Sequence, residues 1–492
     1  MLFQHASNEP QLPTSVPDDA LIWGDIPLAP EEAAGHFLAA GATGSGKTTI
    51  IRLLLQSVFS QFAQNGDNRA MIYDAKQDAL PLIHALAPHV DIATFNPFDA
   101  RGVAWDIAAD VREPRVAIEI AYTLIPDMPE SQPFFTNAAR HLAYGLMASF
   151  MLSNDPWTFA DLVRALKSPR ALKRILKRHE YTRSLLSLYF SDPRLGQNIM
   201  STIATKYLPF EPIAAAWEHA GRRVSLHDWA TSAQTLILPN SEISRAPIDA
   251  INRCIFKLAT DIVLNQSESF TRRSWFVIDE LPAADKLDGL VSLLKKGRSK
   301  GASVVLAFQS ISGLRDQRLY GNFLTDELLG QIGNRFFGRL ECPVTAEWAS
   351  QVIGDQDALT SSHNKTHTPQ GESRGVTKQW QRRRAVLPSQ LMNIPPCSIE
   401  NGLHGYFVLR SIGAFYSSLP GGQLFTSRLV PPANIPEFAP RSPETQFLAP
   451  WTEQQAARFG LVRQKRDKRR SRRRSPDNRP QIRPNDLTDL FG

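Results

Sequence analysis

The sequence predicts an α/β fold in which a mainly parallel sheet carries helices on both faces. Short apolar runs that are typical of buried strands alternate with stretches of helical periodicity. A glycine-rich segment connects one of these strands to one of these helices, and a later apolar run ends in two adjacent carboxylates. Because strands that alternate with helices form parallel sheets with both faces covered, these observations favour the α/β class.

The chain is long enough for two or three domains, since it has 492 residues and 42% of them are hydrophobic. After a flexible lead over residues 1–19, the first part of the core is predicted at 20–112. There the apolar run Phe37–Ala40 ends at a glycine. Residues 48–62 follow with helical spacing of Ile50, Leu53, Leu54 and Val58 on one face.

Residues 113–225 are predicted to be an all-helical insertion. Thr158 and Asp161 have the spacing of a capping box, and Ser168 precedes a proline at the first position of the next helix. The apolar segment 142–152 is too short to span a bilayer and is interpreted as a core helix. Basic side chains accompany these helices, and we predict that they contact DNA phosphates at Lys167, Arg170, Lys173, Arg174, Lys177 and Arg178.

Residues 226–440 are predicted to complete the core, since strand-like runs return at 235–238, 275–278 and 303–308. Within this part, residues 361–384 are polar and lack apolar periodicity, which predicts a mobile loop or linker.

The last segment, 441–492, is predicted to be a disordered basic tail. Residues 463–474 hold nine Lys or Arg residues against one Asp, so most of the net charge of +7 is located there. Such a segment binds an anionic partner, and we favour nucleic acid over a membrane surface or a merely solvated tail. The predicted DNA contacts in the tail are Arg466, Lys468, Arg469, Arg470, Arg472, Arg473 and Arg474.

The three cysteines, Cys254, Cys342 and Cys397, lie far apart and lack the spacing of a metal site. They indicate a reducing compartment and argue against a disulfide-stabilised secreted domain. The sequence has neither a signal-like start nor an apolar run of about 18 residues. We therefore expect a cytoplasmic protein.

Residues 41–48 match the phosphate-binding pattern G-x-x-x-x-G-K-[ST] between a predicted strand and a predicted helix. Glycines let the backbone wrap closely, so that several N–H groups and the start of the helix point at a phosphate. Lys47 is predicted to reach the β- and γ-phosphates, and Thr48 to provide a hydroxyl to Mg²⁺. The predicted ATP-binding residues are Gly41, Ala42, Thr43, Gly44, Ser45, Gly46, Lys47, Thr48 and Thr49.

A second motif places Asp279 and Glu280 after the apolar run 275–278. Ligands of open α/β sheets bind at the carboxyl ends of the strands, where these carboxylates are expected. We predict that Asp279 holds the hydration shell of Mg²⁺ and that Glu280 orients and deprotonates the attacking water.

Three further positions leave alternatives open. Gln309, at the end of the run 303–308, is a candidate γ-phosphate sensor or a structural amide. Arg298 is a candidate arginine finger for a neighbouring subunit or a surface charge. Asp74 and Lys76 either line the nucleotide crevice or only cap the preceding strand.

The order of segments resembles the TraD/TraG class of type IV coupling proteins, within the hexameric DNA-pumping ATPases that include the FtsK and HerA types. The resemblance covers residues 20–415 and rests on GHFLAAG, YDAKQD, FNPFDARGVAWD, FVIDELP, GRSKGASVVLAFQS and NRFFGRLECPVTAEWASQVIG. It implies a RecA-like core with an inserted all-helical domain, a homohexameric ring and DNA transfer to a secretion channel. Such proteins usually carry N-terminal transmembrane helices, which we do not find in the sequence, so we expect recruitment to the inner membrane through a partner.

The leading hypothesis is an ATPase that moves DNA in conjugation or mobilisation, with a relaxase or relaxosome and channel proteins as partners. One alternative is another DNA-pumping or DNA-processing ATPase of the HerA/FtsK type. The other is a nucleotide-gated adaptor that docks a relaxosome to a channel. Glu280 argues against the adaptor, because a switch has no need of a catalytic carboxylate.

Overall fold

The computed structural model describes residues 20–62, 67–126, 133–368 and 371–461. The chain divides into two units, Met1–Pro450 and Trp451–Gly492.

The first unit is built on a nine-stranded sheet. The seven strands from β11 to β5 are parallel, and β14 and β15 are added at one side by antiparallel pairing, β14 to β11 and β15 to β14. The mainly parallel α/β class predicted from the sequence is therefore confirmed. Across the sheet, the strands are β15 (Gly413–Leu419), β14 (Leu403–Leu409), β11 (Asn334–Phe337), β3 (Phe37–Ala40), β10 (Ala302–Phe308), β9 (Arg273–Ile278), β4 (Asn68–Asp74), β8 (Gln234–Pro239) and β5 (Asp91–Thr94).

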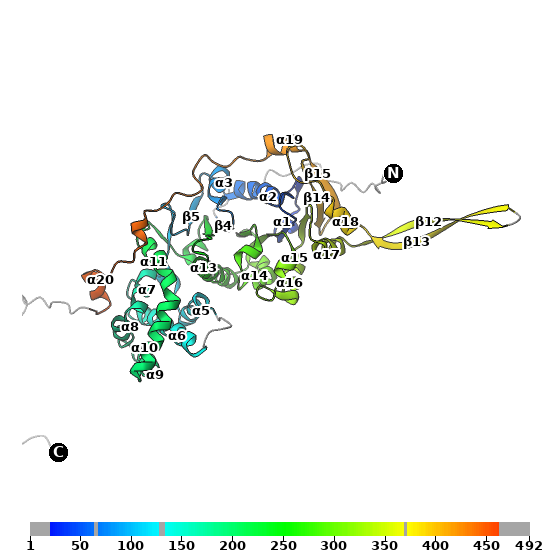
Figure 1. The fold of residues 1–492 in the computed structure, drawn as a ribbon. Coiled ribbons are helices and arrows are strands. Elements are labelled where there is room, and N and C mark those ends of the chain that lie inside the picture. Colours follow the sequence, from blue (N-terminus) through cyan, green and yellow to red (C-terminus); the bar gives the residue numbers. More distant parts are fainter. Residues whose placement is uncertain (1–19, 63–66, 127–132, 369–370, 462–492) are drawn as a thin grey trace, which may run out of the picture. The chain divides into compact units, whose positions relative to one another are not determined.

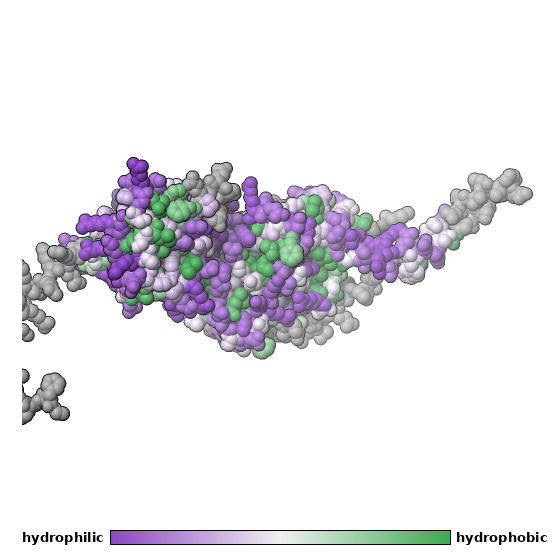
Figure 2. Space-filling view, turned by 90° about the horizontal axis from the view of Figure 1, so that it is seen from below, coloured by the Kyte–Doolittle hydropathy of each residue, from purple (hydrophilic) through white to green (hydrophobic). Residues whose placement is uncertain are grey.

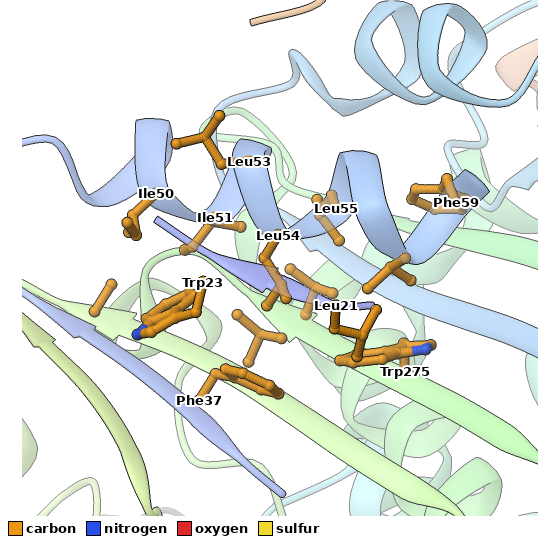
Figure 3. Packing of buried hydrophobic residues seen from close by; sticks show 14 of the residues in the cluster. Leu21, Trp23, Phe37, Ile50, Ile51, Leu53, Leu54, Leu55, Phe59 and Trp275 are labelled. Atoms are coloured by element: carbon orange, nitrogen blue, oxygen red, sulfur yellow. The ribbon is translucent and has the colours of Figure 1, made fainter. Parts of the chain in front are cut away.

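Helices cover both faces of this sheet (Figure 1). On one face, α2 (Lys47–Phe62) buries the apolar stripe that the sequence predicted, against Trp23, Phe37 and Trp275 (Figure 3). On the other face, α13 (Arg245–Asn265) brings Phe256 onto Phe276, with ring centroids 5.7 Å apart. Full burial of both faces explains why the central strands are continuously apolar.

Shorter elements surround the sheet. Strands β1 (Ile22–Trp23) and β2 (Ile26–Pro27) pair antiparallel, whereas β6 (Ala104–Trp105) and β7 (Arg223–Val224) pair parallel. Further helices are α1 (Pro30–Ala33), α3 (Ala79–Leu86), α4 (Ile107–Asp110), α12 (Leu226–Trp229), α14 (Leu290–Lys296), α15 (Ile311–Leu314), α16 (Gly321–Gly330), α17 (Pro343–Ile353), α18 (Pro388–Met392), α19 (Gly421–Gln423), and the 3-10 turns η2 (Leu281–Ala284) and η3 (Arg298–Lys300).

The described residues between β6 and β7 are mostly helical. Thr158 and Asp161 form the predicted capping box of α7, and Ser168 caps α8 through its hydroxyl. No helix in the described ranges has both the length and the apolar character needed to cross a bilayer. The helices are α5 (Pro114–Leu124), α6 (Pro133–Leu152), α7 (Phe159–Lys167), α8 (Pro169–Leu176), α9 (Glu180–Phe190), α10 (Pro193–Tyr207), the turn η1 (Leu208–Phe210) and α11 (Glu211–Glu218).

The prediction of a loop or linker over residues 361–384 is wrong. The chain there forms a two-stranded antiparallel ribbon of β12 (Asp355–Thr368) and β13 (Gly371–Arg384), which extends away from the sheet (Figure 1). Leu359 pairs with Trp380 in the ribbon, and both side chains are more than half exposed. Because the described part of the ribbon buries neither face, its sequence lacks the alternating apolar pattern by which a strand is predicted.

The chain after β15 passes through the turn η4 (Leu424–Arg428) and returns across α2 and α3 (Figure 1). Arg52 Nη2 donates a hydrogen bond to the carbonyl oxygen of Val430 at 2.8 Å. The Ala433 N–H donates to the carbonyl oxygen of Pro81 at 3.0 Å. These bonds fix the returning segment on the helical layer of the core.

Residues 441–461, at the start of the predicted tail, contain the 3-10 turn η5 (Pro443–Gln446) and helix α20 (Glu453–Arg458). Helix α20 begins with a capping box of Thr452 and Gln455, a local signal that our sequence reasoning overlooked. Residues 462–492, which include the predicted DNA-binding arginines and lysine of the tail, lie outside the described residues.

The surface is mixed in character. In Figure 2, the apolar side chains of the face shown lie in small groups separated by polar ones. Exposed large apolar residues are spread over the chain, from Phe134 on α6 to Phe323 on α16. Single exposed apolar residues of this kind are normal on a protein surface.

Candidate nucleotide-binding and catalytic site

The order of the strands brings four chain segments to one edge of the sheet. Strands β3, β10, β9 and β4 are neighbours and parallel, so their carboxyl ends lie side by side. The glycine-rich loop follows β3, and Gln309 follows β10. Asp279 and Glu280 follow β9, and Lys76 follows β4.

The loop at residues 41–48 requires its glycines. Gly44 and Gly46 have φ angles of 73° and 94°, a region that side-chain-bearing residues rarely adopt. A Cβ on Gly46 would lie 2.1 Å from Leu403 Cδ1, and a Cβ on Gly41 would lie 2.2 Å from Ser45 Oγ. The loop is therefore a narrow backbone curve that only this glycine pattern allows.

Lys47 lies inside this curve and starts helix α2. Its ammonium donates to the carbonyl oxygens of Gly41 at 2.7 Å and Ala42 at 3.0 Å. Burial lowers the pKa of Lys47, whereas the nearby Glu280 and Asp279 carboxylates act to raise it. The loop, its lysine and the N-terminus of α2, with Thr49 in its first turn, form a concave positive site suited to phosphate.

Thr48 and Asp279 offer oxygen ligands next to this site. Thr48 Oγ1 donates a hydrogen bond to Asp279 Oδ2 at 3.1 Å. The other carboxylate oxygen, Asp279 Oδ1, is buried and has no hydrogen-bond partner among the described residues. A hydroxyl and a carboxylate with an unsatisfied oxygen fit the preference of Mg²⁺ for oxygen ligands and ordered water.

Glu280 is linked to the glycine-rich loop through Gln309. Gln309 Nε2 donates to Glu280 Oε2 at 3.2 Å, and Thr43 Oγ1 donates to Gln309 Oε1 at 3.3 Å. Burial is the main influence on the pKa of Glu280 and raises it, and the Gln309 hydrogen bond acts in the opposite direction. The arrangement places a base of raised pKa beside a phosphate-binding loop, as activation of a water molecule requires.

The family model for the type IV secretion-system coupling protein DNA-binding domain matches residues 20–411. The chain belongs to this coupling-protein family. It is 25% identical over 429 residues to coupling protein TraD of Escherichia coli (strain K12), and the match covers 85% of this chain and 56% of TraD. The chain thus spans about half the length of the curated relatives it matches.

Solved structures of the conjugative coupling protein TrwB share the fold. The unbound form of TrwB lacking its N-terminal segment superposes with a TM-score of 0.65 at 19% identity, over 86% of this chain and 92% of that one. TrwB in complex with ADP and Mg²⁺ gives a TM-score of 0.63 at 18% identity, over 87% and 94%. At this level of identity, the likeness establishes the fold alone.

In this coupling-protein family member, the structure also brings Lys76 to the site. Its ammonium lies 2.6 Å from both Thr48 Oγ1 and Asp279 Oδ2. The sequence left open whether Lys76 lines the crevice or caps the strand, and the contacts decide for the crevice. The sequence signal for this role was a lysine two residues after the end of β4, a strand that lies next to β9.

Asp74 lines the same cavity as Thr48, Lys76 and Asp279, and it also caps the end of β4. Its carboxylate accepts hydrogen bonds from the backbone N–H groups of Asp78 and Ala79 at 3.1 and 3.2 Å, at the start of α3. Burial and the charge of Asp78 raise the pKa of Asp74 to about 6. Asp74 therefore connects β4 to the following helix.

Arg298 is not part of its own chain's nucleotide site. It lies in η3, immediately before β10, so it is at the amino ends of the strands, opposite the glycine-rich loop. There it lines a cavity together with His36 and Arg410. Arg298 therefore does not reach the glycine-rich loop of its own chain, and its role as an arginine finger for a neighbouring subunit stays a prediction beside that of a surface charge.

The six basic residues of the helical stretch are all exposed. Two of them are engaged in ion pairs, Lys167 with Glu211 and Arg178 with Asp155. Lys173 lies over the ring of Phe190, with its ammonium 4.5 Å from the centroid. Of the six predicted DNA contacts, the exposed cations at positions 170, 174 and 177 are therefore the strongest candidates.

Proposed function

We propose that this protein hydrolyses ATP and uses the energy to move DNA in conjugative transfer. The observation that carries the proposal is the convergence of the Lys47 loop with Glu280 and Gln309 at one edge of the sheet. A docking adaptor needs a nucleotide-binding loop but not a partly buried carboxylate oriented by an amide. The geometry therefore favours an enzyme over a switch.

In the proposed mechanism, the backbone N–H groups of the loop and the Lys47 ammonium bind the β- and γ-phosphates. Thr48 and Asp279 would hold Mg²⁺, which would supply positive charge to offset the charge on the phosphates. Glu280 accepts a proton from the attacking water, and Gln309 holds the Glu280 carboxylate in position. The Thr43–Gln309 hydrogen bond links this amide to the glycine-rich loop, which supports a role for Gln309 in sensing the γ-phosphate.

We further propose that the protein acts as a homohexamer in which Arg298 completes the neighbouring site. The partners would be DNA, a relaxosome and a secretion channel, and contact with the inner membrane would be made through a partner. The match to a DNA-binding family supports the DNA partner. The helical stretch is proposed to be the insertion at 113–225 between core parts 20–112 and 226–440.

The test is ATP hydrolysis by the full chain with and without single- and double-stranded DNA. We expect turnover that DNA stimulates. Glu280→Gln serves as the inactive control. DNA-independent turnover would contradict the coupling of hydrolysis to DNA movement, and nucleotide binding without any turnover would favour the adaptor.

A further inference from the structure

Lys76 occupies the position where the proposed site would hold its metal ion. The ammonium of Lys76 lies 2.6 Å from Thr48 Oγ1 and 2.6 Å from Asp279 Oδ2. They belong to Thr48 and Asp279, the two residues that the proposed function assigns to Mg²⁺. The ammonium therefore bridges a hydroxyl and a carboxylate in the way a bound cation would.

An ammonium and Mg²⁺ cannot share these ligands. Mg²⁺ binds oxygen at about 2.0–2.1 Å in a near-octahedral shell. A metal that contacts both oxygen atoms would overlap the Lys76 ammonium, and the two cations would repel each other. A metal bound directly to Thr48 Oγ1 and Asp279 Oδ2 therefore competes with Lys76 for these oxygen atoms.

We propose that Lys76 is a built-in substitute cation, which neutralises the site until Mg²⁺ displaces it. The inference rests on the proposed nucleotide site and adds a second, competing occupant of its metal position. It predicts that Lys76 supports nucleotide binding without metal and competes with metal when metal is present. If Lys76 only supported the fold, its loss would weaken both nucleotide binding and metal binding.

The surroundings of Lys76 allow its side chain to leave while the backbone stays in place. Gln77 Nε2 donates to the carbonyl oxygen of Asn240 at 2.9 Å, and Asn240 Nδ2 donates to the carbonyl oxygen of Ala75 at 3.0 Å. These two bonds anchor the loop on both sides of Lys76. The Lys76 side chain itself is 47% exposed, so it can move into solvent when displaced.

The energetic balance also permits displacement. The Asp279 side chain is 20% exposed, so its ion pair with Lys76 is only partly shielded from water. Ion pairs of this kind are weak compared with the attraction of a divalent cation to the same carboxylate and to nucleotide phosphates. Lys76 is therefore suited to hold the site without blocking it.

The experiment compares the full-length wild type with Lys76→Met, which keeps the length of the side chain and removes its charge. ADP affinity is measured by calorimetry in a metal chelator. Mn²⁺ affinity is measured by electron paramagnetic resonance at saturating ADP. We expect about three- to tenfold weaker metal-free ADP binding and about three- to tenfold tighter Mn²⁺ binding, from loss of one charged contact.

The matched control is Lys257→Met. Lys257 also forms a lysine–aspartate pair, with Asp261 at 2.6 Å, but it lies on α13 away from the glycine-rich loop. This variant should change neither affinity. Lys76→Arg, which keeps the positive charge, should stay close to the wild type in metal-free ADP binding.

The two measurements separate the inference from the function on which it rests. If Lys76→Met weakens both affinities or leaves Mn²⁺ binding unchanged, the substitute-cation role is wrong while the nucleotide site stands. If the wild type itself binds neither ADP nor Mn²⁺-ADP, the proposed nucleotide site is wrong and the inference falls with it.

Discussion

The side-chain amide of Gln309 donates a hydrogen bond to Glu280 Oε2 across 3.2 Å, from the end of β10 to the end of β9. This bond stabilises the ionised form of Glu280, whereas burial disfavours it. Gln309 thus sets how readily the proposed base ionises, and the same amide accepts a hydrogen bond from Thr43 of the glycine-rich loop.

Replacing Gln309 with leucine should move the acid limb of the pH–turnover profile to higher pH. Without the hydrogen bond, the pKa of Glu280 rises further above its usual value, and more of the base is protonated at a given acidic pH. The measurement is initial ATPase rates between pH 5 and 8. The matched control is Gln351→Leu, which removes a glutamine that donates to Glu347 at 3.0 Å on α17. An unmoved limb would mean that Glu280 is not the titrating base.

Glu280→Gln and Lys47→Ala should have different effects on ATP binding and ATP turnover. Loss of the base leaves the phosphate-binding loop intact, so Glu280→Gln should bind ATP normally but lose turnover by about 10²–10⁴. Lys47→Ala removes the cation inside the loop and should lose both binding and turnover. Equilibrium binding and steady-state hydrolysis are measured side by side. Near-normal turnover by Glu280→Gln would require a different base.

His36 should make the core sensitive to acid. Its Nε2 donates to the Leu294 carbonyl oxygen at 2.9 Å and its Nδ1 accepts from the Val304 N–H at 3.1 Å. Burial lowers the pKa of His36 to about 4. The folded state therefore binds fewer protons than the unfolded state between pH 6.5 and 4, and the free energy of unfolding falls as pH falls through that window.

Between pH 7 and 5, His36 should account for a loss of about 2 kcal/mol in the free energy of unfolding. Denaturant unfolding at the two pH values checks this. His36→Gln should be less stable at pH 7 but should show a smaller decrease on acidification. His84→Gln, at an exposed position of α3, is the control. An equal pH dependence of His36→Gln and wild type would contradict the assignment.

Arg298 should act on the neighbouring subunit. Because it lies at the amino edge of the sheet, its loss leaves the glycine-rich loop of its own chain intact. Arg298→Ala alone should bind nucleotide but hydrolyse it about 10³-fold more slowly. Mixing it with Lys47→Ala should raise turnover above that of either variant, because some interfaces then combine an intact loop with an intact arginine. If no mixing ratio does so, Arg298 is a surface charge.

Charge reversal at Arg170, Arg174 and Lys177 should weaken DNA binding. These side chains are exposed, and phosphate contacts release counterions. The slope of log affinity against log salt should become shallower by about 2–3. Fluorescence anisotropy with labelled DNA at several salt concentrations gives both quantities. Reversal at the exposed core positions Lys286 and Arg318 is the comparison. A lowered melting temperature in the triple variant would indicate misfolding rather than lost contacts.

The sequence predicted the features whose signal is local. The glycine spacing, the apolar run before Asp279 and the stripe on α2 each lie within a few residues, and all appear in the structure as expected. The helix cap at Thr158 is of the same kind. Such features depend on backbone geometry that neighbouring residues determine.

Features that depend on pairing between distant segments were not predictable. The β12–β13 ribbon has mostly polar residues without apolar alternation, so nothing in its sequence distinguishes it from a loop until its strands are paired. The role of Lys76 depends on β4 being the neighbour of β9, which no local pattern reveals. The position of Arg298 likewise depends on the sheet. Only the direction of β10 shows that Arg298 lies at the amino ends of the strands, away from the glycine-rich loop.

Strand β3 has a consequence for how this protein is made. Its neighbours in the sheet are β10 and β11, which the ribosome synthesises long after it, and Thr43 and Gln309 are separated by 266 positions. A nascent chain with its glycine-rich loop already exposed therefore has a strand without partners and a lysine without its carboxylates. The residues of the proposed nucleotide site come together only once β10 and Gln309 have left the ribosome. Until then, the early segments depend on their own helices or on chaperones, and non-local closure of this kind makes folding slow.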